Sequence, residues 1–197
     1  MGLRDILTGR HQVKGPAPDR LFAISTAYIT LQTEHEIVPS GAAAIVFQAL
    51  ATSEFEATLR EMEQVVTSAG GDTGTSVSTQ DDAYGYRWLV LRSPVGAPSI
   101  EDLAVGINAV SGSIETAGHG ERLLCAVFAF LDARKRRVYF IYNYKRGFWY
   151  PFVPASDGSA DEQRSTEREL QLKAQMASEL PMEPELERWF PLWGIPI

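Results

Sequence analysis

Apolar residues recur along the chain with two different periods, and these periods predict strands and helices in turn. Runs rich in β-branched and apolar residues at 21–32 and 42–50 indicate two strands, with Pro39-Ser40-Gly41 between them. Ser53 and Glu56 then have the spacing of a capping box. Apolar residues follow at helical spacing as far as Gly70-Gly71 and predict one helix: Phe55, Leu59, Met62, Val66 and Ala69.

The same order of two strands and one helix is predicted a second time. The residues 73–79 and 84–91 are prone to form strands and flank a turn at Asp81-Asp82, and the alternation places three aromatic residues on one face: Tyr84, Tyr86 and Trp88. Ser99 follows a proline and should cap a helix. The buried stripe expected for this helix is Leu103, Ile107, Val110 and Ile114.

A third round begins at 123–131, which is apolar on both faces and therefore predicts a central strand. A turn at 132–135 leads to a strand at 138–145, and a second capping box, Thr166 with Glu169, opens a helix that runs to about Leu180. Together the three strand-strand-helix units predict an α+β fold, a largely antiparallel sheet of about six strands with three helices on one face.

The chain ends in an aromatic, proline-rich segment that cannot form a long helix. We divide the sequence into a leader, 1–20, and a single α+β domain, 21–197, within which 181–197 is a docking tail. The tail contains three large aromatic residues that would be unfavourable if exposed to solvent and should therefore pack against the rest of the domain: Trp189, Phe190 and Trp193. We expect them to dock on the aromatic edge formed by Phe148, Trp149, Tyr150 and Phe152, while the acidic run Glu183–Glu187 reaches Lys145 and Arg146.

Composition describes one soluble globular domain. The chain has 197 residues, 45% of them hydrophobic, and a net charge of −7, which argues against general binding of nucleic acid. A single cysteine, Cys125, excludes an intrachain disulfide, and no apolar run approaches the roughly 20 residues that span a bilayer. The cytoplasm is therefore the expected compartment, and the sequence does not indicate an oligomeric state.

The first ten residues have some features of a segment that contacts a membrane. Leu3, Ile6 and Leu7 share one side of a short helical turn, and Arg4 and Arg10 add positive charge. A segment this short rarely anchors a protein, so ordinary packing is the favoured interpretation. Transient contact at the inner face of the cell membrane is the alternative.

Charge is distributed unevenly along the second half of the chain. The residues 134–146 contain six Lys and Arg residues and no acid, whereas 157–187 are strongly acidic. A solvated hairpin and a solvated helix would account for this pattern. Alternatively, the two regions attract each other or face a partner of opposite charge.

The residues do not form a recognisable catalytic set. Cys125 lies in an apolar strand, the histidines at 11, 35 and 119 are scattered, and no motif for zinc, phosphate or nucleophilic serine is present. We therefore expect no catalytic residues, no metal ion and no cofactor. Lys145-Arg146-Gly147, beside Trp149 and Tyr150, is the best candidate for an anion contact, although a salt bridge to the acidic helix would explain it equally well.

Several motifs spread over almost the whole chain resemble one protein family. They are Met1-Gly2-Leu3 through Gly9-Arg10, Tyr84–Val90 (YGYRWLV), Leu123-Leu124-Cys125, Tyr144–Gly147 (YKRG), Tyr150-Pro151-Phe152, Pro154, Leu180-Pro181 with Glu183-Pro184, and Arg188–Pro191 (RWFP) with Trp193-Gly194. On these motifs the chain resembles the PspA-associated protein PspAB family, named for association with the phage-shock protein PspA. The residues 148–149 and 156–165 are less typical of it.

The resemblance implies a non-enzymatic cytoplasmic accessory, or adaptor, of an envelope stress response that binds a PspA-like coiled-coil protein. It carries no catalytic residues over. The aromatic and basic residues of the two motif-rich stretches are our candidates for contact with this partner: Tyr144, Lys145, Arg146, Trp149, Tyr150, Phe152, Arg188, Trp189 and Trp193. The alternative function is a domain that binds an anionic small molecule, or hydrolyses one, in a pocket near Arg146 and Tyr150.

Overall fold

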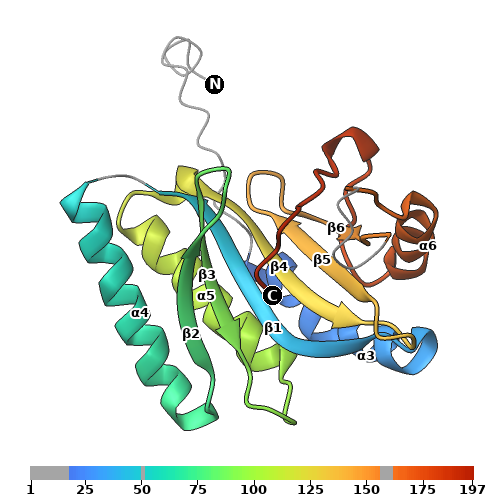
Figure 1. Cartoon of the computed structure of the whole chain (residues 1–197), viewed down its shortest axis with the longest axis horizontal. Helices are drawn as coiled ribbons and strands as arrows, with labels where there is room; N and C mark the ends of the chain where they lie inside the picture. Colours follow the sequence, from blue (N-terminus) through green and yellow to red (C-terminus); the bar gives the residue numbers. More distant parts are fainter. Residues whose placement is uncertain (1–17, 50–51, 156–161) are drawn as a thin grey trace, which may run out of the picture.

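The computed structural model describes residues 18–49, 52–155 and 162–197, which form an α+β fold around one antiparallel sheet (Figure 1). The sheet has six strands in the order β2-β3-β1-β4-β5-β6. The strands are β1 (Val38–Gln48), β2 (Ser76–Asp81), β3 (Tyr86–Arg92), β4 (Leu123–Leu131), β5 (Arg137–Asn143) and β6 (Phe148–Phe152). The helices are α2 (Pro18–Phe22), α3 (Ile24–His35), α4 (Ser53–Thr73), α5 (Ile100–Thr116) and α6 (Thr166–Met176), with 3-10 turns η1 (Gly120–Arg122) and η2 (Leu186–Arg188). The predicted fold class is confirmed.

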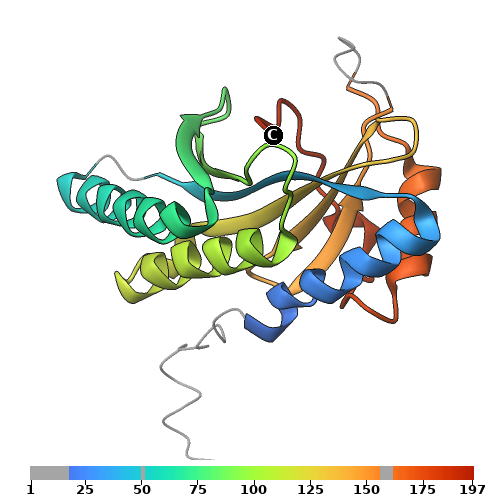
Figure 2. The ribbon, with the colours of Figure 1, turned by 90° about the horizontal axis from the view of Figure 1, so that it is seen from below.

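The two faces of the sheet pack against different parts of the chain. Alternate residues of β1, namely Ala43, Ile45 and Phe47, face the layer of helices, and Figure 2 shows α3, α4 and α5 together on that side. We call this side the helix face. The intervening residues of β1 are Ala42, Ala44 and Val46, and they belong to a separate apolar cluster on the opposite side, which we call the cleft face.

The prediction of a strand at 21–32 is wrong, because Ile24–His35 forms helix α3. Its β-branched residues favour strands, but its buried residues Ile24, Ala27 and Leu31 recur at the i, i+3, i+7 spacing of one helix face. The sixth strand is instead β6, which pairs with β5. Pro151 lies within it, and proline is tolerated in an edge strand because one side of the strand donates no ladder hydrogen bond.

These two changes also alter the predicted succession of elements. Instead of three strand-strand-helix units, the chain runs through one, two and then three strands before α4, α5 and α6, respectively. The prediction that β4 is central is confirmed, since it pairs with β1 on one side and β5 on the other.

The capping predictions have different outcomes. At α5 the prediction is confirmed, because Ser99 Oγ accepts a hydrogen bond from the Asp102 N–H at 3.1 Å and the expected apolar stripe is buried. At α4 the cap lies one residue earlier, since Thr52 Oγ1 accepts from the Phe55 N–H at 3.3 Å. At α6 the capping box is wrong: the Glu169 carboxylate instead accepts from the Val153 N–H and from Arg164.

Helix α5 approaches the sheet closely at Gly106, and this contact gives a testable prediction. A Cβ at Gly106 would lie 2.3 Å from Leu91 Cδ2, whereas a Cβ at Gly112 on the same helix would meet nothing within 4 Å. Gly106→Ala should lower the free energy of unfolding by about 1–3 kcal/mol through overpacking. Gly112→Ala is the matched control and should raise it by up to about 1 kcal/mol, because alanine favours a helix more than glycine. Urea denaturation of both variants checks this, and equal shifts for the two would contradict the close approach.

Residues 189–197 cross the cleft face, with their chain end in front of the sheet (Figure 1). Trp189 is buried and stacks on Tyr150 with ring centroids 6.2 Å apart, and Trp193 meets the Phe152 ring edge-to-face at 5.0 Å. Phe190 differs from the expectation, since 60% of it is exposed. Trp149 differs too, because its ring packs on the helix face against Phe128.

Candidate functional site

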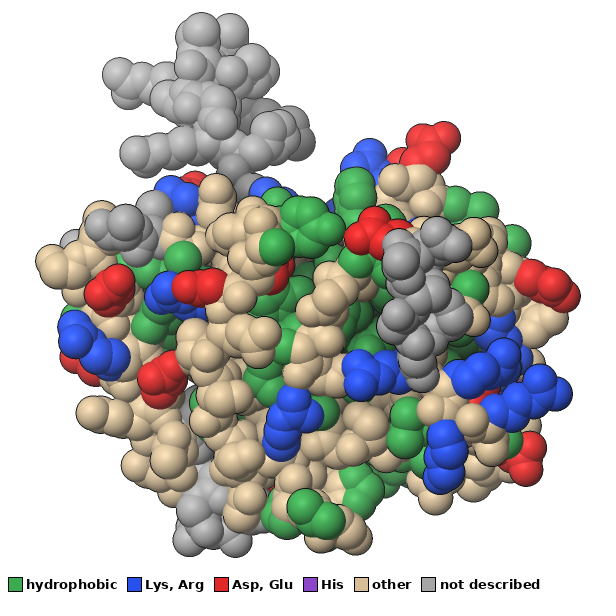
Figure 3. Space-filling view, viewed as in Figure 1, with side chains coloured by type: hydrophobic (Ala, Val, Ile, Leu, Met, Phe, Trp, Pro, Cys, Tyr) green, Lys and Arg blue, Asp and Glu red, His purple; other side chains and the backbone are tan. Residues whose placement is uncertain are grey.

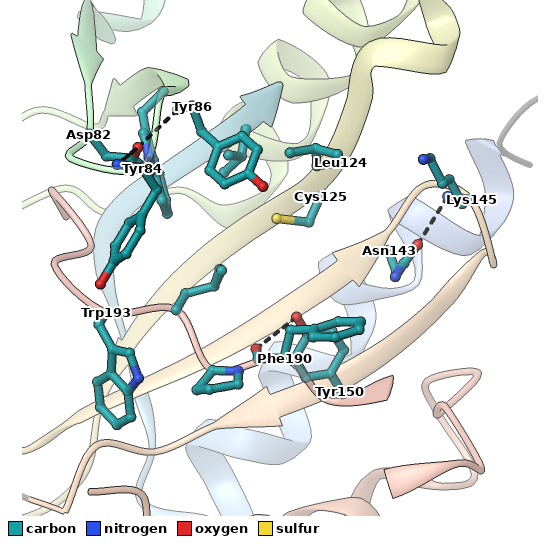
Figure 4. Close-up of a pocket in the computed structure, with 14 residues that line it drawn as sticks. Asp82, Tyr84, Tyr86, Leu124, Cys125, Asn143, Lys145, Tyr150, Phe190 and Trp193 are labelled. Atoms are coloured by element: carbon teal, nitrogen blue, oxygen red, sulfur yellow. Dashed lines mark hydrogen bonds between the residues drawn. The ribbon is translucent and has the colours of Figure 1, made fainter. Parts of the chain in front are cut away.

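The cleft face contains an open hollow of about 530 Å³ between the β2–β3 hairpin and residues 190–193. Figure 4 shows the side chains of the hairpin on one side of it and those of the tail on the other, and hydrophobic side chains gather in the middle of this face in Figure 3. We call this hollow the aromatic cleft. Its lining residues are Val46, Asp82, Tyr84, Tyr86, Trp88, Leu124, Cys125, Asn143, Lys145, Tyr150, Phe190, Pro191, Leu192 and Trp193.

One carboxylate organises the hairpin wall of the cleft. Asp82 Oδ1 accepts hydrogen bonds from the N–H groups of Tyr84 (2.8 Å) and Tyr86 (2.9 Å), and Oδ2 accepts from Trp88 Nε1 at 2.9 Å. These bonds fix the turn and the indole together, which confirms the turn predicted at Asp81-Asp82. They also leave Tyr84 and Tyr86 at the rim, 64% and 40% exposed, respectively.

Side chains from the body of the domain hold the opposite wall by donating hydrogen bonds to main-chain carbonyls of the tail. The Tyr150 hydroxyl donates to the Phe190 carbonyl at 3.2 Å, and Arg164 donates to the Trp189 carbonyl at 2.7 Å. Further along, Arg92 donates to the Pro196 carbonyl at 2.7 Å. These anchors, at residues 189, 190 and 196, hold the tail wall against the rest of the domain.

The floor of the cleft is apolar, and its thiol is unreactive. It includes Val46 from β1 with Leu124 and Cys125 from β4. Burial raises the pKa of the Cys125 thiol to about 12, so the thiolate is scarcely populated at neutral pH. Burial also raises the pKa of the Tyr150 hydroxyl well above its ordinary value. The floor therefore favours apolar contact over nucleophilic chemistry.

Lys145 supplies the cationic group that lines the cleft. The Asn143 side-chain oxygen accepts a hydrogen bond from the Lys145 N–H at 3.0 Å and so shapes the turn that presents the lysine (Figure 4). The lysine side chain is exposed, and its ammonium group meets no acceptor within the described ranges. A carboxylate or phosphate could therefore bind there.

The structure separates the nine candidate residues from the sequence into three groups. Lys145, Tyr150 and Trp193 line the cleft. Tyr144 and Trp149 are buried on the helix face, whereas Phe152 and the tail residue Trp189 are buried in the apolar cluster of the cleft face. Arg146 and Arg188 bind acidic residues of the tail and do not line the cleft: Arg188 Nε donates to Glu185 at 2.7 Å.

Arg146 joins the basic hairpin to the acidic tail. Its guanidinium forms a bidentate pair with the buried Glu183, at 2.6 and 3.0 Å, and also reaches Glu185 at 3.0 Å. Arg188, and to a smaller extent Arg146, lowers the pKa of the Glu185 carboxyl. Arg146 therefore supports the interpretation that the basic and acidic regions attract each other. Lys145 does not take part in this pairing and lines the cleft instead.

Several cleft residues were not among the candidates, although the sequence carried a signal for some of them. The alternation that places Tyr84, Tyr86 and Trp88 on one face of a strand is visible in the sequence, and all three line the cleft. Leu124 and Asn143 gave no signal, since each is an ordinary strand residue whose position depends on the order of the strands in the sheet.

The described part of the chain contains neither a cluster of metal ligands nor a helix that could span a membrane. Within 18–49, 52–155 and 162–197, the His, Cys, Asp and Glu side chains do not gather in groups of three that could hold a metal ion. None of the helices in the described part of the chain combines the length and the apolar character needed to cross a bilayer. The membrane contact predicted for residues 1–10 lies outside the described residues.

The fold and the site define an α+β protein whose sheet carries an open aromatic cleft, walled by a hairpin and a tail. A model of the PspAB family, described as PspA associated protein B, matches residues 1–197, and the chain belongs to this family. The resemblance found in the sequence motifs is thus confirmed over the whole chain. No curated protein and no solved structure matches this chain.

Proposed function

We propose that this protein is a non-enzymatic accessory of an envelope stress response and acts by binding a PspA-like coiled-coil protein in the cytoplasm. The observation that carries the proposal is the family match over the entire chain, since the family is described by association with PspA. The complex would form at the inner face of the cell membrane, in keeping with the stress response that the family resemblance implies.

The exposed surface supports a contact function. Tyr84, Tyr86 and Phe190 are 64%, 40% and 60% exposed around the apolar cleft. Aromatic side chains grouped at the surface are typical of protein interfaces, where they contribute a large share of the binding energy. The inert thiol at the cleft floor favours this interpretation over covalent catalysis.

A pull-down from cells with and without membrane stress tests the proposal, followed by direct mixing of the two purified proteins. We expect PspA to be enriched with the tagged chain and the purified proteins to bind without a third component. If PspA is never enriched while a metabolite repeatedly copurifies, the protein is a small-molecule-binding domain and the accessory role is wrong.

A further inference from the structure

The aromatic cleft continues into a second hollow of about 320 Å³. The two hollows share four lining residues, namely Asp82, Tyr84, Trp88 and Trp193, so they form one groove across the cleft face. An elongated groove of this kind suits a length of polypeptide better than a compact small molecule.

The two ends of this groove carry opposite charge. Lys145 lies at the end next to β5 and has no acidic partner among the described residues. At the other end the lining includes Asp81 and Glu162. Asp81 is already paired with Arg87 at 2.6 Å, whereas the exposed Glu162 meets no cation in the described part of the chain.

The middle of the groove is largely apolar, and the side-chain oxygens of Asp82 and Tyr150 are already hydrogen-bonded within the protein. All three hydrogen bonds to Asp82 come from the hairpin itself, and the Tyr150 hydroxyl is bound to the Phe190 carbonyl. A bound segment therefore finds apolar and aromatic surface in the middle and free charge at the ends.

We infer that the groove binds one segment of the PspA-like partner, with an apolar centre, an acidic residue placed at Lys145 and a basic residue placed at Glu162. This inference rests on the proposed function and adds to it the surface and the chemistry of the partner segment. The opposite charges of the two ends give the segment a single direction in the groove, because the reverse direction would bring like charges together.

The test measures the affinity of purified full-length PspA for the full chain and for variants with exposed substitutions. Phe190→Ala and Tyr84→Ala should each weaken binding roughly tenfold or more, since they remove exposed aromatic contacts. Leu186→Ala is the matched control: Leu186 is a 47% exposed residue of the same tail outside the groove lining, and its variant should bind like wild type.

Charge reversal tests the two ends separately. Lys145→Glu and Glu162→Lys should each weaken binding by roughly five- to tenfold and reduce its dependence on salt. Arg134→Glu, on the exposed β4–β5 turn, and Glu34→Lys, on α3, are the matched controls and should leave the affinity unchanged. Melting temperatures close to wild type will show that each variant is folded.

The outcomes separate this inference from the proposed function. If wild type does not bind PspA, both are overturned. If wild type binds and the groove variants bind equally well, the surface assignment alone is wrong. Native mass spectrometry could instead find a small amphipathic anion bound to the wild-type protein. If Phe190→Ala loses this anion but still binds PspA as wild type does, the surface assignment is also overturned.

Discussion

Trp189→Ala is expected to lower the free energy of unfolding by about 3–5 kcal/mol, the cost typical of removing a buried tryptophan. Trp189 is 4% exposed, stacks on Tyr150 and donates its indole N–H to the Glu183 carbonyl at 3.2 Å. The loss is a large share of the 5–15 kcal/mol that stabilises most domains. Chemical denaturation followed by circular dichroism measures it.

Two matched variants show whether this loss comes from burial. Phe190→Ala removes the neighbouring aromatic ring, which is 60% exposed, and Glu185→Gln weakens an exposed ion pair with Arg188. Both should leave the melting temperature close to that of wild type. If Trp189→Ala also leaves it unchanged but abolishes PspA binding, Trp189 contacts the partner directly and its burial does not stabilise the domain.

The second large effect is expected at the ion pair that joins α6, β6 and the tail. Arg164→Met should cost about 3–5 kcal/mol, because it leaves the fully buried Glu169 carboxylate without its positive partner. In wild type Arg164 Nε donates to Glu169 Oε2 at 2.8 Å, and Oε1 accepts from the Val153 N–H at 2.9 Å. Adding Glu169→Gln to Arg164→Met should recover part of the loss, since the amide oxygen can still accept from Val153.

The pH dependence of the Arg164→Met variant follows from the same contacts. Burial raises the pKa of the Glu169 carboxyl, while Arg164 and the Val153 N–H oppose that rise. Removing Arg164 should raise this pKa further, so the folded state would bind a proton more readily than the unfolded chain. The free energy of unfolding of the variant should therefore increase as pH falls through the raised pKa and level off below the ordinary value of the carboxyl. Denaturation at a series of pH values checks this, and a pH profile parallel to that of wild type would contradict it.

Local signals in the sequence predicted much of the fold, and long-range packing decided the rest. Ser99 was predicted as a cap because its hydrogen bond is local, and 123–131 as a central strand because both faces are apolar. The prediction of a strand at 21–32 is wrong because β propensity reflects packing against neighbours more than the backbone itself. Here the neighbours are α5 and β1, which bury Ile24 and Leu31 in a helix.

The candidate site was harder to predict than the fold. The sequence indicates aromatic residues as candidates for contact, but it does not say which side of the sheet each one faces. Trp149 and Tyr150 are adjacent, so they point to opposite faces of β6, and only Tyr150 reaches the cleft. The cleft also depends on β1 lying between β3 and β4, which no local pattern encodes.

The central position of β1 has a kinetic consequence. The pairs β2–β3, β4–β5 and β5–β6 each join strands that are close in sequence, whereas β1 pairs with β3 and β4 across the intervening helices. Hairpins form in microseconds, but closing long loops slows folding. We therefore expect two strand groups to form early and β1 to join them in the slow step, so that the cleft exists only once the last and most distant pairing is made.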